Sequence, residues 1–122
     1  MVENNTPVLI VSRPGRVRDG LQALLTAMPQ IGAVDLVDDG LSVLNVATKR
    51  RPALVLLDTH TPSDEIHTTL RNIKTMWPQT PCIVLASNGR QQRDARAAGA
   101  DGVLLKGYPA TQLFAIVEGL LS

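Results

Sequence analysis

Five short apolar runs, each separated from the next by a segment with helical periodicity, limit what this 122-residue chain can fold into. The runs are rich in β-branched residues and lie near 8–11, 33–37, 53–57, 82–86 and 102–105. Strands that alternate with helices of about 10–15 residues form βαβ units, which build a parallel sheet covered on both faces. The pattern therefore predicts an α/β protein, a three-layer (βα)5 sandwich.

The segments between the runs carry helix signals. Apolar residues recur at steps of three and four, which gives each helix one apolar stripe toward the sheet. Arg51-Pro52 closes one such segment, and Pro78 stands just past the end of another. We expect helices near 17–28, 41–48, 64–77, 90–98 and 110–121.

Composition excludes several classes of function. Hydrophobic residues make up 44% and charged residues 19%, with a formal net charge of +1, as in a globular domain. Aromatic residues at 2% argue against base-stacking platforms, and no long basic block is present, so we expect no nucleic acid binding by this domain. No apolar stretch approaches about 18 residues and no signal peptide is visible, so we expect a cytoplasmic protein without membrane contact. The single Cys82 lies in an apolar run and is expected to be a small buried hydrophobe.

A carboxylate, Asp58, ends the most hydrophobic of the five runs. In open parallel sheets, ligands bind beyond the carboxyl ends of the strands, where the strand order reverses. For the order 2-1-3-4-5 that point lies between the first and third strands, so Ser12 and Arg13, which follow the first strand, would neighbour Asp58. Lys106 follows the fifth strand and would reach across the end of the fourth. The sequence therefore predicts one carboxylate flanked by two cations, Arg13 and Lys106.

Four motifs, in this order and spacing over residues 8–121, resemble the receiver domain of two-component response regulators. The first of them is similar to the first helix of the NarL/LuxR-type subgroup. The motifs are Arg18-Asp19-Gly20-Leu21-Gln22-Ala23-Leu24-Leu25; Leu56-Leu57-Asp58 with Pro62 four residues on; Thr80-Pro81 before Cys82-Ile83-Val84-Leu85; and Ala97-Ala98-Gly99-Ala100-Asp101-Gly102-Val103-Leu104-Leu105-Lys106.

The resemblance implies a flavodoxin-like fold and one receiver-like domain over 1–122, with a signalling role and no enzymatic activity. It implies that Asp58 is the phosphoacceptor position and Lys106 the family's lysine, with Mg²⁺ as the family's cofactor and a histidine kinase as partner. It also implies that the domain regulates transcription through a helix-turn-helix output domain that is absent from this chain.

The chain departs from the family's pattern at the site itself. The family has two acidic residues where this chain has Ser12 and Arg13. The switch Ser/Thr position falls on Ala86, with Ser87 one step later, and the aromatic switch position falls on Val103. The usual proline after the lysine is Gly107.

These departures weaken the case for a metal site. Mg²⁺ needs near-octahedral oxygen ligation, usually with one or two carboxylates. Asp58 beside Arg13 is a poor magnesium site, because the guanidinium repels a divalent cation. Asp38 and Asp39 follow the second strand, one strand too far out. We therefore expect no cofactor.

Three interpretations of the site stay open. In the first, Asp58, Arg13 and Lys106 form a fixed ion-pair cluster, and an atypical receiver signals by binding or dimerising. In the second, Asp58 is a functional phosphoacceptor. In the third, the chain is an unrelated flavodoxin-like domain that binds a small molecule, because Asp58-Thr59-His60 resembles the Asp-x-His motif of cobalamin-binding domains.

Three arginines, Arg90, Arg93 and Arg96, recur at three-residue spacing along the helix near 90–98. They line one face, which is either a solvated surface or part of a homodimer face. In the resemblance, that dimer face is formed by the helix near 90–98, the strand 102–105 and the helix 110–121.

Overall fold

The computed structural model of this chain describes residues 6–38, 51–58 and 63–121. Within these ranges it forms one parallel sheet of five strands in the order β2-β1-β3-β4-β5. The strands are β1 Thr6–Val11, β2 Ile31–Val37, β3 Leu54–Asp58, β4 Cys82–Ala86 and β5 Gly102–Leu105. This confirms the α/β flavodoxin-like fold and the strand order expected from the sequence.

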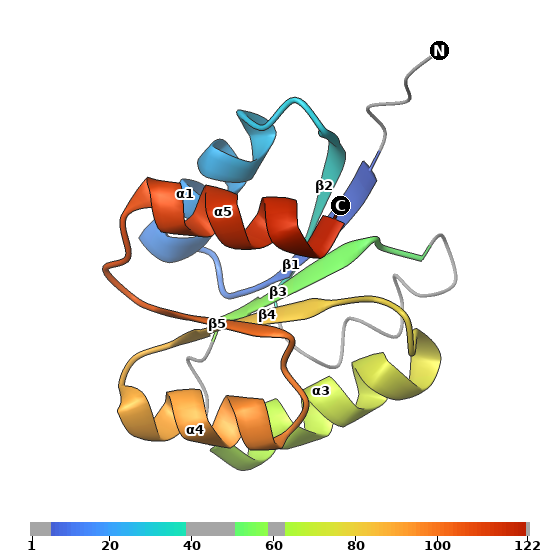
Figure 1. Cartoon of the computed structure of the whole chain (residues 1–122), viewed down its shortest axis with the longest axis vertical. Coiled ribbons are helices and arrows are strands. Elements are labelled where there is room, and N and C mark those ends of the chain that lie inside the picture. Colours follow the sequence, from blue (N-terminus) through green and yellow to red (C-terminus); the bar gives the residue numbers. More distant parts are fainter. Residues whose placement is uncertain (1–5, 39–50, 59–62, 122) are drawn as a thin grey trace.

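Helices cover both faces of the sheet, which gives three layers (Figure 1). The helices are α1 Arg16–Thr26, α3 Ser63–Met76, α4 Gly89–Ala97 and α5 Ala110–Leu121. Helices α1 and α5 lie on one face and α3 and α4 on the other (Figure 1). The helix expected near 41–48 lies outside the described residues. No described helix is long and apolar enough to cross a membrane.

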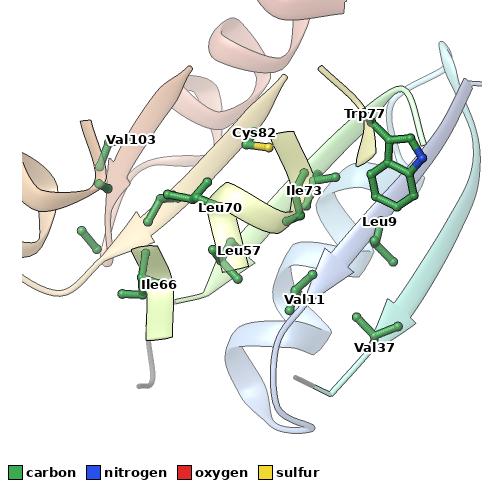
Figure 2. Packing of buried hydrophobic residues seen from close by; sticks show 14 residues of the cluster. Leu9, Val11, Val37, Leu57, Ile66, Leu70, Ile73, Trp77, Cys82 and Val103 are labelled. Atoms are coloured by element: carbon green, nitrogen blue, oxygen red, sulfur yellow. The ribbon is translucent and has the colours of Figure 1, made fainter. Parts of the chain in front are cut away.

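The core is aliphatic and divided by the sheet into two clusters. Alternate strand side chains point to opposite faces, so Val8 and Ile10 face α1 and α5, whereas Leu9 and Val11 face α3. Figure 2 shows the cluster on the α3 side of the sheet. Trp77, which is 6% exposed, follows the end of α3 and packs over the sheet near Leu9. Because β3 is buried on both faces, it reads as a continuous apolar run rather than an alternating one.

An ion pair fastens the edge of the sheet where β4 begins. Asp101 Oδ2 lies 2.6 Å from Lys74 Nζ and accepts a hydrogen bond from the Cys82 amide at 2.8 Å. Lys74 Nζ also donates to the Thr80 carbonyl at 3.0 Å. These bonds join α3, β4 and the turn before β5. Burial raises the pKa of the neighbouring Cys82 thiol to about 11, which keeps the thiol protonated, as befits the small buried hydrophobe expected here.

The register of the sheet brings two chain segments together at its carboxyl edge. Val11, the last residue of β1, pairs with Leu57 of β3. The residues that follow, Ser12 and Asp58, therefore emerge side by side at the edge. The ladder extends one residue past β1 and β5, because Ser12 N donates to the Val37 carbonyl at 2.9 Å and Lys106 N donates to the Ala86 carbonyl at 2.8 Å.

Candidate functional site

The Asp58 side chain at the end of β3 is fully buried, and both of its carboxylate oxygens contact neighbouring side chains. Its Oδ1 lies 2.7 Å from Lys106 Nζ, and its Oδ2 accepts a hydrogen bond from Ser12 Oγ at 3.1 Å. Charge attraction rather than a well-aligned hydrogen bond defines the contact between Lys106 and Asp58. The structure thus brings together residues from the ends of β1, β3 and β5.

Lys106 reaches Asp58 across the end of β4, which ends in Ala86. Ala86 is completely buried, and its side chain is a single methyl group. The lysine side chain is 23% exposed, so its ammonium lies at the boundary between the buried carboxylate and solvent. One cation therefore balances the charge of one buried anion.

Arg13 does not join this cluster, which corrects the expectation of two cations around Asp58. Its side chain is exposed, whereas Ser12 is 4% exposed and faces Asp58. Successive residues of an extended chain point to opposite sides, so when Ser12 turns inward the next side chain turns away. Ser12 Oγ also lies 3.2 Å from the Arg13 carbonyl, so its single proton serves two acceptors.

The residues at the family's switch positions carry no polar group toward Asp58. Val103 is 6% exposed and packs in the apolar cluster under α3. Ser87 lies past the end of β4 and is exposed, and its N–H donates to Gln91 Oε1 at 2.7 Å in the first turn of α4. In that turn Asn88 Oδ1 accepts from Gln91 N at 2.9 Å and caps the helix. Ser87 therefore does not replace the hydroxyl that Ala86 lacks.

The described residues do not fit a magnesium site. Among them, no group of three or more His, Cys, Asp or Glu side chains could hold a metal ion. Asp38 does not help, because its Oδ1 pairs with Arg18 Nη1 at 2.8 Å and its side chain is 65% exposed. Asp39 lies outside the described residues. A lone carboxylate already paired with an ammonium is a poor partner for a divalent cation.

Tyr108 is a neighbour of the site that the sequence motifs did not single out. Burial and, to a smaller extent, the negative charge of Asp58 raise the pKa of its phenol. Its backbone N–H donates to the Leu105 carbonyl at 3.1 Å, closing a turn through Gly107. Gly107 has a φ of +93°, a conformation that proline cannot adopt. The chain therefore enters α5 through a turn that the family's usual proline could not form. In the sequence, the pair Gly107-Tyr108 after the lysine was the only sign that Tyr108 would lie near the site.

His60 and Thr59, which carry the resemblance to the Asp-x-His motif, lie outside the described residues, as does Pro62. The exposed arginines Arg90, Arg93 and Arg96 lie on α4.

Comparisons with known proteins agree with this geometry. The sequence model of the response regulator receiver domain matches residues 8–118, and the chain belongs to this family. The chain is 32% identical over 103 residues to protein-glutamate methylesterase/protein-glutamine glutaminase 1 of Chromobacterium violaceum, covering 81% of this chain and 28% of that protein. It is 24% identical over 118 residues to the transcriptional regulatory protein DegU of Brevibacillus brevis, covering 95% of this chain and 50% of that protein. The chain thus spans half or less of these curated relatives.

Among solved structures, the chain is similar to the receiver domain of a sensor histidine kinase from Pseudomonas aeruginosa PAO1. The TM-score is 0.81 at 22% identity, and the match covers 95% of this chain and 97% of that one. In that structure a magnesium ion is coordinated in the active site cleft. At this identity the likeness concerns the fold.

Proposed function

We propose that this chain is an atypical receiver domain of a two-component response regulator, which signals without Mg²⁺-dependent phosphorylation of Asp58. The observation that carries the proposal is the occupation of the Asp58 carboxylate by the chain's own side chains. One oxygen contacts the Lys106 ammonium at 2.7 Å and the other accepts from the Ser12 hydroxyl at 3.1 Å.

The chemistry of phosphoryl transfer explains why this arrangement weakens the reaction. A carboxylate nucleophile needs a cation that bridges it to the incoming phosphoryl oxygens and neutralises their charge. The Lys106 ammonium supplies one positive charge, but Ser12 offers a neutral hydroxyl where a metal would need a second carboxylate. The buried pair is already charge-balanced.

A domain without this switch would signal through protein contacts, and the α4–β5–α5 face supports that role. Leu105 on β5 is a large hydrophobic residue that is 43% exposed. The exposed Arg90, Arg93 and Arg96 lie on α4, which packs beside β5. An apolar centre with arginines nearby is typical of protein interfaces. We propose this face for homodimerisation, with Arg93→Glu expected to lower self-association in sedimentation equilibrium; unchanged self-association would contradict it.

Transcription regulation belongs to the same proposal. DegU, a transcriptional regulatory protein, matches this chain over half its own length, and the first helix resembles the NarL/LuxR-type subgroup. We place the domain in the cytoplasm, with a histidine kinase as the partner class and DNA binding in a helix-turn-helix domain outside this chain.

A titration with beryllium fluoride and Mg²⁺ tests the proposal. Beryllium fluoride mimics a phosphoryl group on Asp58, and we expect no change in the amide NMR spectrum of the wild type. A double variant, Ser12→Asp with Arg13→Asp, introduces two carboxylates at the end of β1, one of them at the inward-facing position 12, and is expected to respond. A saturable Mg²⁺-dependent response of the wild type that is absent in Asp58→Asn would overturn the proposal in favour of a working phosphoacceptor.

A further inference from the structure

A cavity of about 250 Å³ lies between α1 and the loop that joins β5 to α5. Its apolar lining comes from Val17, Leu21 and Leu24 of α1 and from Leu85 of β4. Its volume is somewhat below the roughly 300–1,000 Å³ of pockets for drug-sized ligands, so it suits a smaller molecule.

The charged groups of the cavity have one sign. Among the described residues, Arg16 and Lys106 line it and no acidic side chain does, although the Lys106 ammonium also pairs with Asp58 at 2.7 Å. Tyr108 also lines it and brings a phenolic hydroxyl, which can donate a hydrogen bond. The cavity therefore complements a molecule with one anionic end and an apolar body.

We propose that this cavity binds a small amphipathic carboxylate, with its anion between Arg16 and Lys106 and its apolar body against Val17, Leu21 and Leu24. A small molecule suits this site because its volume of about 250 Å³ is small and its lining combines apolar side chains with two cationic ones. The proposal does not depend on whether Asp58 accepts a phosphoryl group.

The site is coupled to Asp58 through a shared lysine. Lys106 lines the cavity and is also the cation that lies 2.7 Å from Asp58 Oδ1. A carboxylate in the cavity and the carboxylate of Asp58 therefore compete for one ammonium. Ligand binding would weaken the hold of Lys106 on Asp58, and removing the Asp58 charge would strengthen ligand binding.

Two glycines provide a matched pair of variants. A Cβ added at Gly20, which lines the cavity, meets no atom within 4 Å, and the same is true at Gly119 of α5, which does not line it. Gly20→Leu places a side chain at the cavity without a backbone clash. Gly119→Leu makes the same change in helix composition elsewhere.

The experiment is an amide NMR titration of the whole chain with octanoate, and with octan-1-ol as the uncharged comparison. We expect saturable shifts at Leu21, Gly107 and Tyr108 with a dissociation constant on the order of 1 mM, and weaker binding of the alcohol. Gly20→Leu should abolish these shifts and Gly119→Leu should preserve them.

Charge variants test the anion's place. Arg16→Gln should weaken octanoate binding roughly two- to fivefold, the range for a partly exposed ion pair, and Asp58→Asn should strengthen it. Absence of saturable shifts with octanoate would overturn the proposal and favour a protein partner as the occupant of the cavity. Equal binding of alcohol and carboxylate, or binding that Gly20→Leu leaves unchanged, would also overturn it.

Discussion

Replacing Lys106 by methionine should destabilise the fold markedly, because the change leaves a fully buried carboxylate without its cation. At the observed 2.7 Å separation, the attraction is roughly 6 kcal/mol at an effective dielectric of about 20, before the desolvation of both groups is subtracted. Breaking a buried pair by removing one partner costs about 3–5 kcal/mol. Because the Lys106 side chain is 23% exposed, we expect a loss near the lower end, about 3 kcal/mol.

Urea unfolding followed by circular dichroism measures this loss as a shift of the midpoint at constant slope. Asp58→Asn should cost about 1 kcal/mol or less, because it removes the buried charge and leaves Lys106 access to water. The control is Lys74→Met, which breaks a pair whose partners are 27% and 36% exposed and should cost about 1 kcal/mol. Equal losses in the two lysine variants, or a larger loss in Asp58→Asn than in Lys106→Met, would refute the reasoning.

Three further predictions concern stability. Gly20→Ala should raise the free energy of unfolding by about 1 kcal/mol, since its Cβ meets open space within a helix. Gly102→Ala should lower the free energy of unfolding by about 1–3 kcal/mol, because its Cβ would lie 2.6 Å from Ile116 Cδ1. Thermal melts of both variants check this contrast. Ser12→Ala should cost about 1 kcal/mol by removing the hydroxyl donor of the buried carboxylate, and urea midpoints equal to wild type would count against that bond. Folding raises the pKa of the Cys82 thiol from 9.0 to about 11, so the folded state holds the proton longer and stability should fall as pH rises from about 9 to 11. A pH series of unfolding midpoints should show a steeper fall in the wild type than in a Cys82→Ala control.

The sheet was predictable because its central strands β3 and β4 are buried at every position. The run that ends at Asp58 is apolar at every position before the carboxylate, whereas a helix packed on a sheet needs apolar residues along one stripe only. The strand order then followed from the alternation with helices and the resemblance. That strand order and the small Ala86 were enough to predict that Asp58 and Lys106 meet at the carboxyl edge.

The error at Arg13 shows what sequence patterns leave open. A motif of two adjacent residues does not say which of them continues the strand and which turns outward, and here Ser12 takes the inner position. The same limit applies to the turn through Gly107, whose positive φ places Tyr108 beside the cavity. Both details depend on backbone dihedrals at a strand end, which residue types alone do not determine.

Reaction with acetyl phosphate tests the central claim, that Asp58 does not take up a phosphoryl group. The measurement is the intact mass of the chain after incubation with acetyl phosphate and Mg²⁺, with the Ser12→Asp and Arg13→Asp double variant beside it. The account predicts an unchanged mass for the wild type and the gain of one phosphoryl group for the double variant. An acid-labile phosphoryl adduct on the wild type that is missing from Asp58→Asn would contradict it.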